Sequence, residues 1–268
     1  MTDIKGTKII AIANHKGGVG KTTTTLNLAD GLAHRGKSVL VIDCDPQNNL
    51  SQHIGHQHPA RITHSLADML VNPSIPLDLF LHEETQIPGV ALIYGGISLE
   101  NVDDVLKNDF PRPNEVLKSR IAPLMGLVDY ILIDCPPSLK LLTMNALAAA
   151  THYIVPVASG APYAIYGLSD LKNRVDRVRL INPDLDFVGA LLVMHDSRAT
   201  LCRESEEAAD QLFGKLIPVK ISNTTKVNQS VAKNESVRML DRTNKVARQY
   251  QEFADYLITY CEGETANV

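Results

Sequence analysis

The stretch His15-Lys16-Gly17-Gly18-Val19-Gly20-Lys21-Thr22-Thr23 decides the fold of this chain of 268 residues. Before it lies the apolar and β-branched run Lys8–Ala13, a composition typical of a buried parallel strand. After it, apolar residues recur at helical spacing from Leu26 until Gly36, which suits the C-terminus of a helix. A strand, a glycine-rich turn, Gly-Lys-Thr and a helix, in this order, predict a phosphate-binding loop (P-loop).

The chemistry of this loop follows from its backbone. Glycines let successive N–H groups curl towards phosphate oxygens, and the N-terminus of the following helix adds partial positive charge. Lys21 is placed to reach the β- and γ-phosphates, which makes it a candidate catalytic residue, and the Thr22 hydroxyl is placed to bind Mg²⁺. The residues expected to contact the nucleotide are Lys16, Gly17, Gly18, Val19, Gly20, Lys21, Thr22 and Thr23.

The loop departs from the usual pattern G-x-x-x-x-G-K-[ST], because His15 stands where the pattern has glycine. The next residue is a second lysine, Lys16. One interpretation makes Lys16 a solvated loop residue. The alternative, which the surrounding loop favours, directs its side chain to a nucleotide held by a second copy of the chain. A cation supplied across an interface accelerates phosphoryl transfer by roughly 10³–10⁵. We therefore predict that Lys16 is catalytic and that the protein dimerises around its nucleotide.

Carboxylates follow two further apolar segments. Asp43 and Asp45 flank one residue at the end of the predicted strand within Lys37–Gln47. Ligands collect at the carboxyl ends of parallel strands, and alternation puts these two side chains on one side of an extended backbone. The segment Val128–Asp134 ends in a third carboxylate, which is able to hold a Mg²⁺-bound water beside the phosphates. The predicted metal ligands are Thr22, Asp43 and Asp134.

The order of elements along the chain predicts the fold class. Apolar strands alternate with helices, which indicates an α/β fold with a mostly parallel sheet flanked by helices on both faces, as in P-loop NTPases. The further strands expected are Val90–Tyr94, Tyr153–Val157, Asp186–Met194 and Leu216–Val219, and helices are expected at Leu141–Leu147 and Ser169–Leu180. We expect one domain over residues 1–268, with its core at Lys8–Leu257 and a short acidic C-terminal tail; residues 51–125 are expected to form short helices and surface loops.

These motifs together resemble a known family. Lys16–Thr23 is similar to the deviant P-loop of the ParA/MinD group of ATPases, and the order of later motifs is most similar to ParA-type (Soj-like) DNA partition ATPases. The resemblance implies that Asp45 orients or activates the attacking water and that Asp43 supports Mg²⁺. Relatives usually continue Pro-Gln-Gly-Asn where this chain has Asn48, which tolerates a left-handed backbone. The segment 162–167 is similar to the family's Tyr-Ala-Leu-Glu-Gly, with Tyr166 where glutamate is common.

The nucleotide and its consequences follow from the same resemblance. A guanine-reading Asn-Lys-x-Asp is absent, because Asn244-Lys245-Val246-Ala247 lacks the acid, so ATP with Mg²⁺ is expected. By loose analogy, Asn223 is placed near the adenine. ParA proteins bind double-stranded DNA without sequence preference as ATP-dependent homodimers, and a ParB-like partner stimulates their weak hydrolysis. The family's DNA-contacting basic residues correspond to Arg198, Lys226 and Lys245.

The charge distribution supports a polyanion surface although the net charge of the chain is −4. Residues 215–248 contain eight basic residues and two acidic ones (Glu235 and Asp241). The basic residues are Lys215, Lys220, Lys226, Lys233, Arg238, Arg242, Lys245 and Arg248. A solvated surface without a ligand is the alternative interpretation.

Composition limits the function classes. No apolar run of 18 residues exists, the N-terminus is polar, and the C-terminus is acidic where MinD-type ATPases carry a basic amphipathic helix. We therefore expect a cytoplasmic, nucleoid-associated protein without membrane attachment. Four scattered cysteines do not have the spacing of metal ligands. The alternatives are a ParA-like ATPase that positions a protein cargo on the nucleoid, a MinD-like membrane-bound ATPase and a P-loop cofactor-synthesis enzyme.

Overall fold

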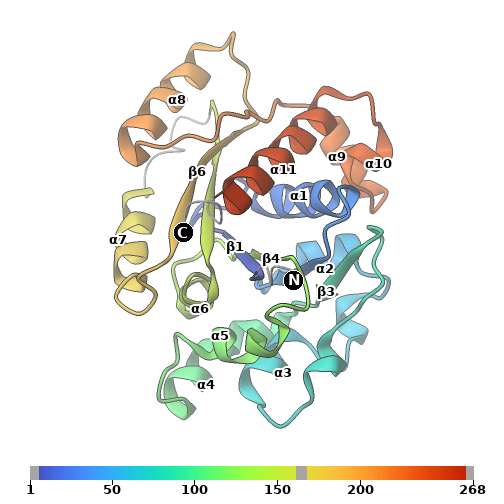
Figure 1. Cartoon of the computed structure of the whole chain (residues 1–268), viewed down its shortest axis with the longest axis vertical. Helices are drawn as coiled ribbons and strands as arrows, with labels where there is room; N and C mark the ends of the chain where they lie inside the picture. The colour runs from blue at the N-terminus through green and yellow to red at the C-terminus, as the bar shows by residue number, and fades with distance from the viewer. Residues whose placement is uncertain (1–5, 161–167, 264–268) are drawn as a thin grey trace.

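The computed structural model describes residues 6–160 and 168–263, which form a parallel sheet between two layers of helices (Figure 1). The sheet has six strands in the order β3-β2-β4-β1-β5-β6, and every pairing is parallel. The strands are β1 (Lys8–Ile12), β2 (Val39–Asp43), β3 (Val90–Ile93), β4 (Tyr130–Asp134), β5 (His152–Ala158) and β6 (Asp186–Val193). The predicted α/β class is confirmed.

Helices cover both faces of the sheet, which explains why its strands are apolar on both sides. On β1, Ile9 belongs to one core cluster and Ile10 to the other, because successive side chains point to opposite faces. The first cluster includes α3 (Leu66–Val71), α4 (Val102–Asp109), α5 (Val116–Ile121), α6 (Leu141–Ala149), α7 (Leu168–Val178) and α8 (Thr200–Phe213). The second includes α1 (Lys21–His34), α2 (Asn49–Ile54), α10 (Val237–Leu240) and α11 (Lys245–Gly263); α9 (Lys226–Ala232) precedes α10.

The predicted strand Leu216–Val219 is wrong. It forms an isolated bridge in which Leu216 pairs with Ala190 of β6, and the Ile217 N–H donates to the Ala190 carbonyl at 2.9 Å. The pairing resumes further on, where the Ile221 N–H donates to the Leu192 carbonyl at 2.8 Å and His195 pairs with Ser222. Between Ile217 and Ile221 the segment has two residues more than the facing part of β6, so the register breaks and no continuous strand forms. The other predicted strands and helices are present, with ends that differ by a few residues. The helix α11 continues past Leu257 to Gly263, whereas residues 162–167 and the tail 264–268 lie outside the described ranges.

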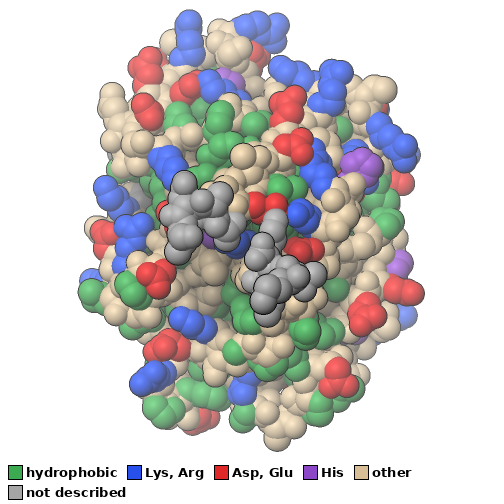
Figure 2. Space-filling model, in the orientation of Figure 1, with side chains coloured by type: hydrophobic (Ala, Val, Ile, Leu, Met, Phe, Trp, Pro, Cys, Tyr) green, Lys and Arg blue, Asp and Glu red, His purple; other side chains and the backbone are tan. Residues whose placement is uncertain are grey.

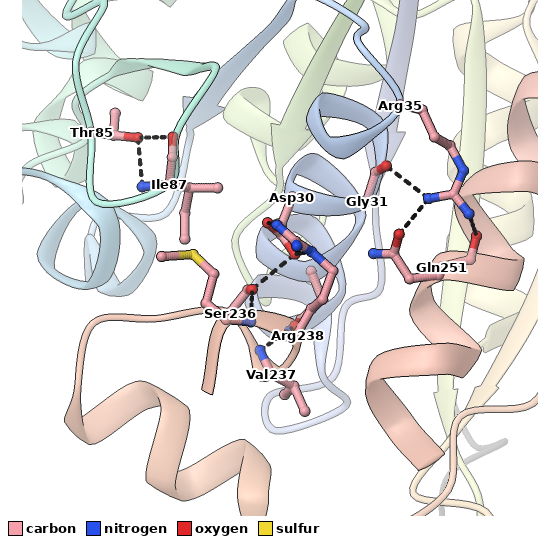
Figure 3. Close-up of polar contacts among 11 residues, drawn as sticks. Asp30, Gly31, Arg35, Thr85, Ile87, Ser236, Val237, Arg238 and Gln251 are labelled. Carbon is pink, nitrogen blue, oxygen red and sulfur yellow. Dashed lines mark hydrogen bonds and ion pairs between the residues drawn. The ribbon is translucent and has the colours of Figure 1, made fainter. Parts of the chain in front are cut away.

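Helix α1, which carries the P-loop lysine, is fixed to the C-terminal part of the chain by two polar clusters (Figure 3). The Asp30 carboxylate accepts hydrogen bonds from Arg238 Nε at 2.8 Å, Arg238 Nη2 at 2.7 Å and Ser236 Oγ at 2.8 Å. One turn further on, Arg35 donates to the Gly31 carbonyl and to Gln251 of α11. These buried and half-buried contacts hold the helix behind the P-loop in one position.

Candidate nucleotide-binding site

The P-loop connects β1 to α1 in the backbone conformation that its glycines allow. Gly18 has φ +73° and Gly20, the residue before α1, has φ +79°, both in the left-handed region. A Cβ atom on Gly20 would also lie 3.4 Å from Val193 at the end of β6. The predicted loop is thus built at the carboxyl edge of the sheet, with the first turn of α1 directly behind it.

Lys21 is buried within this loop, with 6% of its surface exposed. Its Nζ donates to the Lys16 carbonyl at 3.0 Å, so the ammonium group is held inside the curl of the backbone. Burial lowers the pKa of Lys21, and the carboxylates of Asp134 and Asp45 act in the opposite direction. An anion in the loop would complete the neutralisation of this desolvated cation.

Thr22 and Asp134 meet, although 112 positions separate them in the sequence. The Thr22 hydroxyl donates to Asp134 Oδ2 at 2.7 Å, and Asp134 is fully buried at the end of β4. Burial, and next the charge of Asp43, raise the pKa of Asp134 to about 8, against the lowering effects of Thr22 and Lys21. This crowded carboxylate beside a hydroxyl suits a divalent cation, which would neutralise it.

Asp43 is equally buried but already fully hydrogen-bonded. Its carboxylate accepts from the backbone and the hydroxyl of Ser51, at 2.8 and 2.7 Å, and from the Asp45 backbone at 3.1 Å. Burial raises its pKa to about 6. Gly95 donates its N–H to the same Ser51 hydroxyl, and a Cβ on Gly95 would lie 2.6 Å from the Asp43 carbonyl. Glycine at position 95 therefore fits the close approach of this loop to Asp43.

Asp45 lies beyond β2, with 8% of its surface exposed. Its Oδ1 accepts the Gln47 N–H at 3.0 Å, and the turn closes through Asn48, whose φ of 46° confirms the expected left-handed backbone. Asp45 lines a cavity of 480 Å³ together with the Pro136-Pro137 turn that follows β4, which we call the switch turn. The structure thus brings the segment that follows β2 and the segment that follows β4 together around one cavity.

Asp134→Asn is expected to stabilise the nucleotide-free protein at neutral pH. A folded-state pKa of about 8, above the ordinary 3.8, means that the folded protein binds this proton more tightly than the unfolded chain. Stability therefore falls as the pH rises from about 4 to 8, and asparagine removes that loss while still accepting the Thr22 hydrogen bond. Urea unfolding with EDTA is expected to show a gain of at least about 1 kcal/mol at pH 8 and a smaller one at pH 5. An equal gain at both pH values would contradict this assignment.

Asn223, the residue expected near adenine, lies in a different cavity, of 530 Å³. Arg198 and Lys245 line the same cavity, so two of the three expected DNA-contacting residues meet there. Arg198 is largely exposed, and its guanidinium group pairs with Asp196 at 3.0 Å. The buried His195 also lines this cavity, and desolvation lowers its pKa.

Lys226 begins α9, outside that cavity, with its Nζ 3.9 Å from Asp241. Of the basic residues between 215 and 248, Lys215 and Arg238 are engaged inside the fold, whereas the half-exposed Lys220 lines the cavity that holds Arg198 and Lys245. Lys215 binds the Phe187 carbonyl and the Tyr260 hydroxyl, Lys220 pairs with Glu206, and Arg238 pairs with Asp30. Lys233, Arg242, Lys245 and Arg248 are exposed. Basic side chains accordingly gather over α9 and α10, with acidic ones among them (Figure 2).

Asn14 was not among the predicted site residues, although it sets the shape of the loop. It is 1% exposed, its amide donates to the Pro156 carbonyl at 2.7 Å, and its Oδ1 accepts the Lys16 N–H at 3.0 Å. A polar residue directly between a buried strand and a glycine-rich turn was the available signal. Ser51 was missed for another reason, since no local pattern links it to Asp43.

Metal-binding clusters and membrane-spanning helices are two further features that a chain of this kind could carry. Within residues 6–160 and 168–263, no three or more His, Cys, Asp or Glu side chains form a cluster arranged to hold a metal. Among the helices of these ranges, none is long and apolar enough to cross a membrane.

Comparisons with known proteins agree with this geometry. The profile of the AAA domain family matches residues 7–187. The chain is 36% identical over 245 residues to the chromosome partitioning protein ParA of Myxococcus xanthus, covering 91% of this chain and 85% of that protein. It is 35% identical over 249 residues to the sporulation initiation inhibitor protein Soj of Bacillus subtilis, covering 92% and 96%.

A solved structure is similar over nearly the whole chain. It is titled cobyrinic acid a,c-diamide synthase from Mycobacterium smegmatis with bound ADP and magnesium, with a TM-score of 0.82, 32% identity and 96% of each chain covered. The P-loop, the parallel sheet and the ParA and Soj relatives confirm the resemblance found in the sequence. The chain belongs to the ParA/Soj family of P-loop ATPases, within the AAA domain family.

Proposed function

We propose that this protein is a ParA-type DNA partition ATPase, which binds non-specific double-stranded DNA as an ATP-dependent dimer. The observation that carries the proposal is the meeting of Lys21, Thr22 and Asp134 at the P-loop, with Asp45 nearby across the switch turn. The similarity to ParA and Soj supports the partition role and a cytoplasmic, nucleoid-associated location.

ATP and Mg²⁺ suit this constellation. Lys21 would bind the β- and γ-phosphates, and the backbone N–H groups of residues 16–23 would hold their oxygens. Thr22 and Asp134 would hold Mg²⁺, whose role in such sites is to neutralise charge that develops on the transferred phosphoryl group. Asp43 would support this arrangement by fixing the segment around Ser51 through its two hydrogen bonds to that residue. A cluster of three carboxylates is not required, because phosphates and water complete the coordination of Mg²⁺.

Hydrolysis would depend on two further residues. Asp45 faces the cavity at the switch turn, where it would orient and deprotonate a water molecule. Lys16 would reach the nucleotide of the second protomer. Within its own loop, Lys16 holds Lys21 through its backbone carbonyl, which leaves the Lys16 side chain for a contact with the other protomer. A ParB-like partner would stimulate this slow reaction, and opening of the dimer would release DNA.

DNA binding would use Arg198, Lys245 and Lys226, and the first two line one cavity together with Asn223. Dimerisation would join two such surfaces, and their combined avidity would make affinity depend on ATP. A ParA-like ATPase that positions a protein cargo on the nucleoid would use the same surface. DNA binding through these residues is therefore expected whether the cargo is DNA or protein.

The proposal is tested by DNA binding in the presence of a slowly hydrolysed ATP analogue. Arg198→Gln and Lys245→Gln are each expected to weaken binding to duplexes of unrelated sequence about equally and to lower the salt slope by about 1. Arg177→Gln, on exposed α7, is the matched control. Unchanged affinity in both variants, with dimerisation intact by light scattering, would exclude this surface as the DNA site.

The similarity to a structure titled as a diamide synthase favours a cofactor-synthesis enzyme as the second candidate. Such amidation draws ammonia from glutamine through an activated thiol in many enzymes. Here all four cysteines are buried, and burial raises the pKa of Cys44 and Cys135. Glutamine-dependent ADP formation in a corrinoid assay, without any effect of DNA, would support this candidate against the partition role.

A further inference from the structure

A groove of 580 Å³ lies between the α4–α5 connection and the end of α3, on the face of the sheet opposite α1. Its apolar lining includes exposed Pro73, Pro111 and Ala122, together with half-buried Phe110 and buried Val116. None of the residues assigned above to the nucleotide or to DNA lines it. The groove therefore offers a surface with no role in the proposed ATPase cycle.

Arg120 of α5 lines this groove with an unusual hydrogen-bond deficit. Its Nε atom is buried and has no hydrogen-bond partner among the described residues, and Nη2 makes one long contact, 3.3 Å, to the Leu70 carbonyl at the end of α3. Desolvation lowers the pKa of Arg120, and no carboxylate in the described part of the chain is among the causes of this shift. A partly desolvated guanidinium group that lines a groove with hydrogen-bond donors to spare is a binding element for a carboxylate.

The charges around Arg120 are mostly positive. Arg112 and Lys118 line the groove as exposed cations, and Glu115 is the single acid among the lining residues. Glu115 lies 3.9 Å from Arg112, so it offsets that cation and leaves Lys118 and Arg120 without an acidic partner among the described residues. The surface thus combines an apolar floor with an excess of positive charge.

We infer that this groove binds an acidic, apolar segment of a partner protein. An apolar side chain would bury Phe110 and the prolines, while a neighbouring Asp or Glu would pair with Arg120 and Lys118. A nucleotide fits less well, because the lining Pro73 and Pro111 have no backbone N–H to offer a phosphate, and Glu115 adds a negative charge to the lining. The site goes beyond the proposed ATPase function.

The test uses the full chain and a phage-displayed library of random peptides as the probe. Selection on the wild-type protein is expected to enrich peptides with Asp or Glu beside a large apolar residue. Fluorescence anisotropy of an enriched peptide is expected to show at least about tenfold weaker binding to Arg120→Gln and to Lys118→Gln. Arg177→Gln, with its change on α7, is expected to bind like the wild type.

Several outcomes would overturn the inference. These are enriched peptides without acidic residues, binding that neither variant changes, or displacement of the peptide by AMP or a short oligonucleotide at lower concentration than by the unlabelled peptide. Loss of thermal stability in Arg120→Gln with unchanged peptide affinity would assign Arg120 to capping α3 instead. Because Lys118 is exposed, Lys118→Gln keeps the test decisive even if Arg120→Gln does not fold.

Discussion

Asp45→Asn is expected to slow ATP hydrolysis by about 10²–10⁴-fold while leaving ATP affinity nearly unchanged. The amide keeps the oxygen that accepts the Gln47 N–H, so the turn after β2 is preserved, but it no longer takes a proton from water. Phosphate release under single-turnover conditions and titration with a fluorescent ATP analogue separate the two effects. Because hydrolysis ends DNA binding in the proposed cycle, the variant is also expected to stay on DNA after ATP is added.

Glu100→Gln provides the matched control, since Glu100 is an exposed acid that lines the same cavity. It is expected to hydrolyse ATP like the wild type. If Asp45→Asn turned over normally, Asp45 would not be the catalytic base, and the cavity at the switch turn would need another role.

Lys16→Gln is expected to lower stimulated ATP hydrolysis by about 10³–10⁵-fold, the range for a cation supplied from the partner in phosphoryl transfer. ATP binding is expected to persist, because the Lys16 carbonyl, which holds Lys21, is unaffected by the side-chain change. Rates in the presence of DNA and the ParB-like partner give the first effect, and equilibrium titration gives the second.

Mixing Lys16→Gln with Asp45→Asn decides from which protomer Lys16 acts. In a mixed dimer, one site would combine an intact Asp45 with an intact Lys16 from the other protomer, so activity is expected to return. If Lys16 acted within its own protomer, every site would lack one residue, and the mixture would stay inactive. Failure to recover activity in dimers shown to be mixed would therefore refute the cross-interface role.

Local patterns were sufficient for the elements that carry the site. The glycines of the loop need left-handed φ values, and the apolar strands ending in Asp43 and Asp134 need burial on both faces; both requirements act over a few residues. For the same reason Asn48 was correctly expected to replace glycine in its turn. The predicted strand Leu216–Val219 failed because a short apolar run does not reveal whether its register with the neighbouring strand is continuous, and here it breaks after Ile217.

The sequence by itself therefore determined the P-loop, the order of the strands and helices along the chain, and the family. Only the tertiary structure decided which side chains meet: Thr22 with Asp134, Ser51 with Asp43, and Asn223 with Arg198 and Lys245. It also showed that Lys215 and Arg238 are used inside the fold, although composition grouped them with the DNA surface. The physical reason is that dihedral preference and hydrophobic period act locally, whereas hydrogen bonds and charge pairs depend on the packing of distant segments.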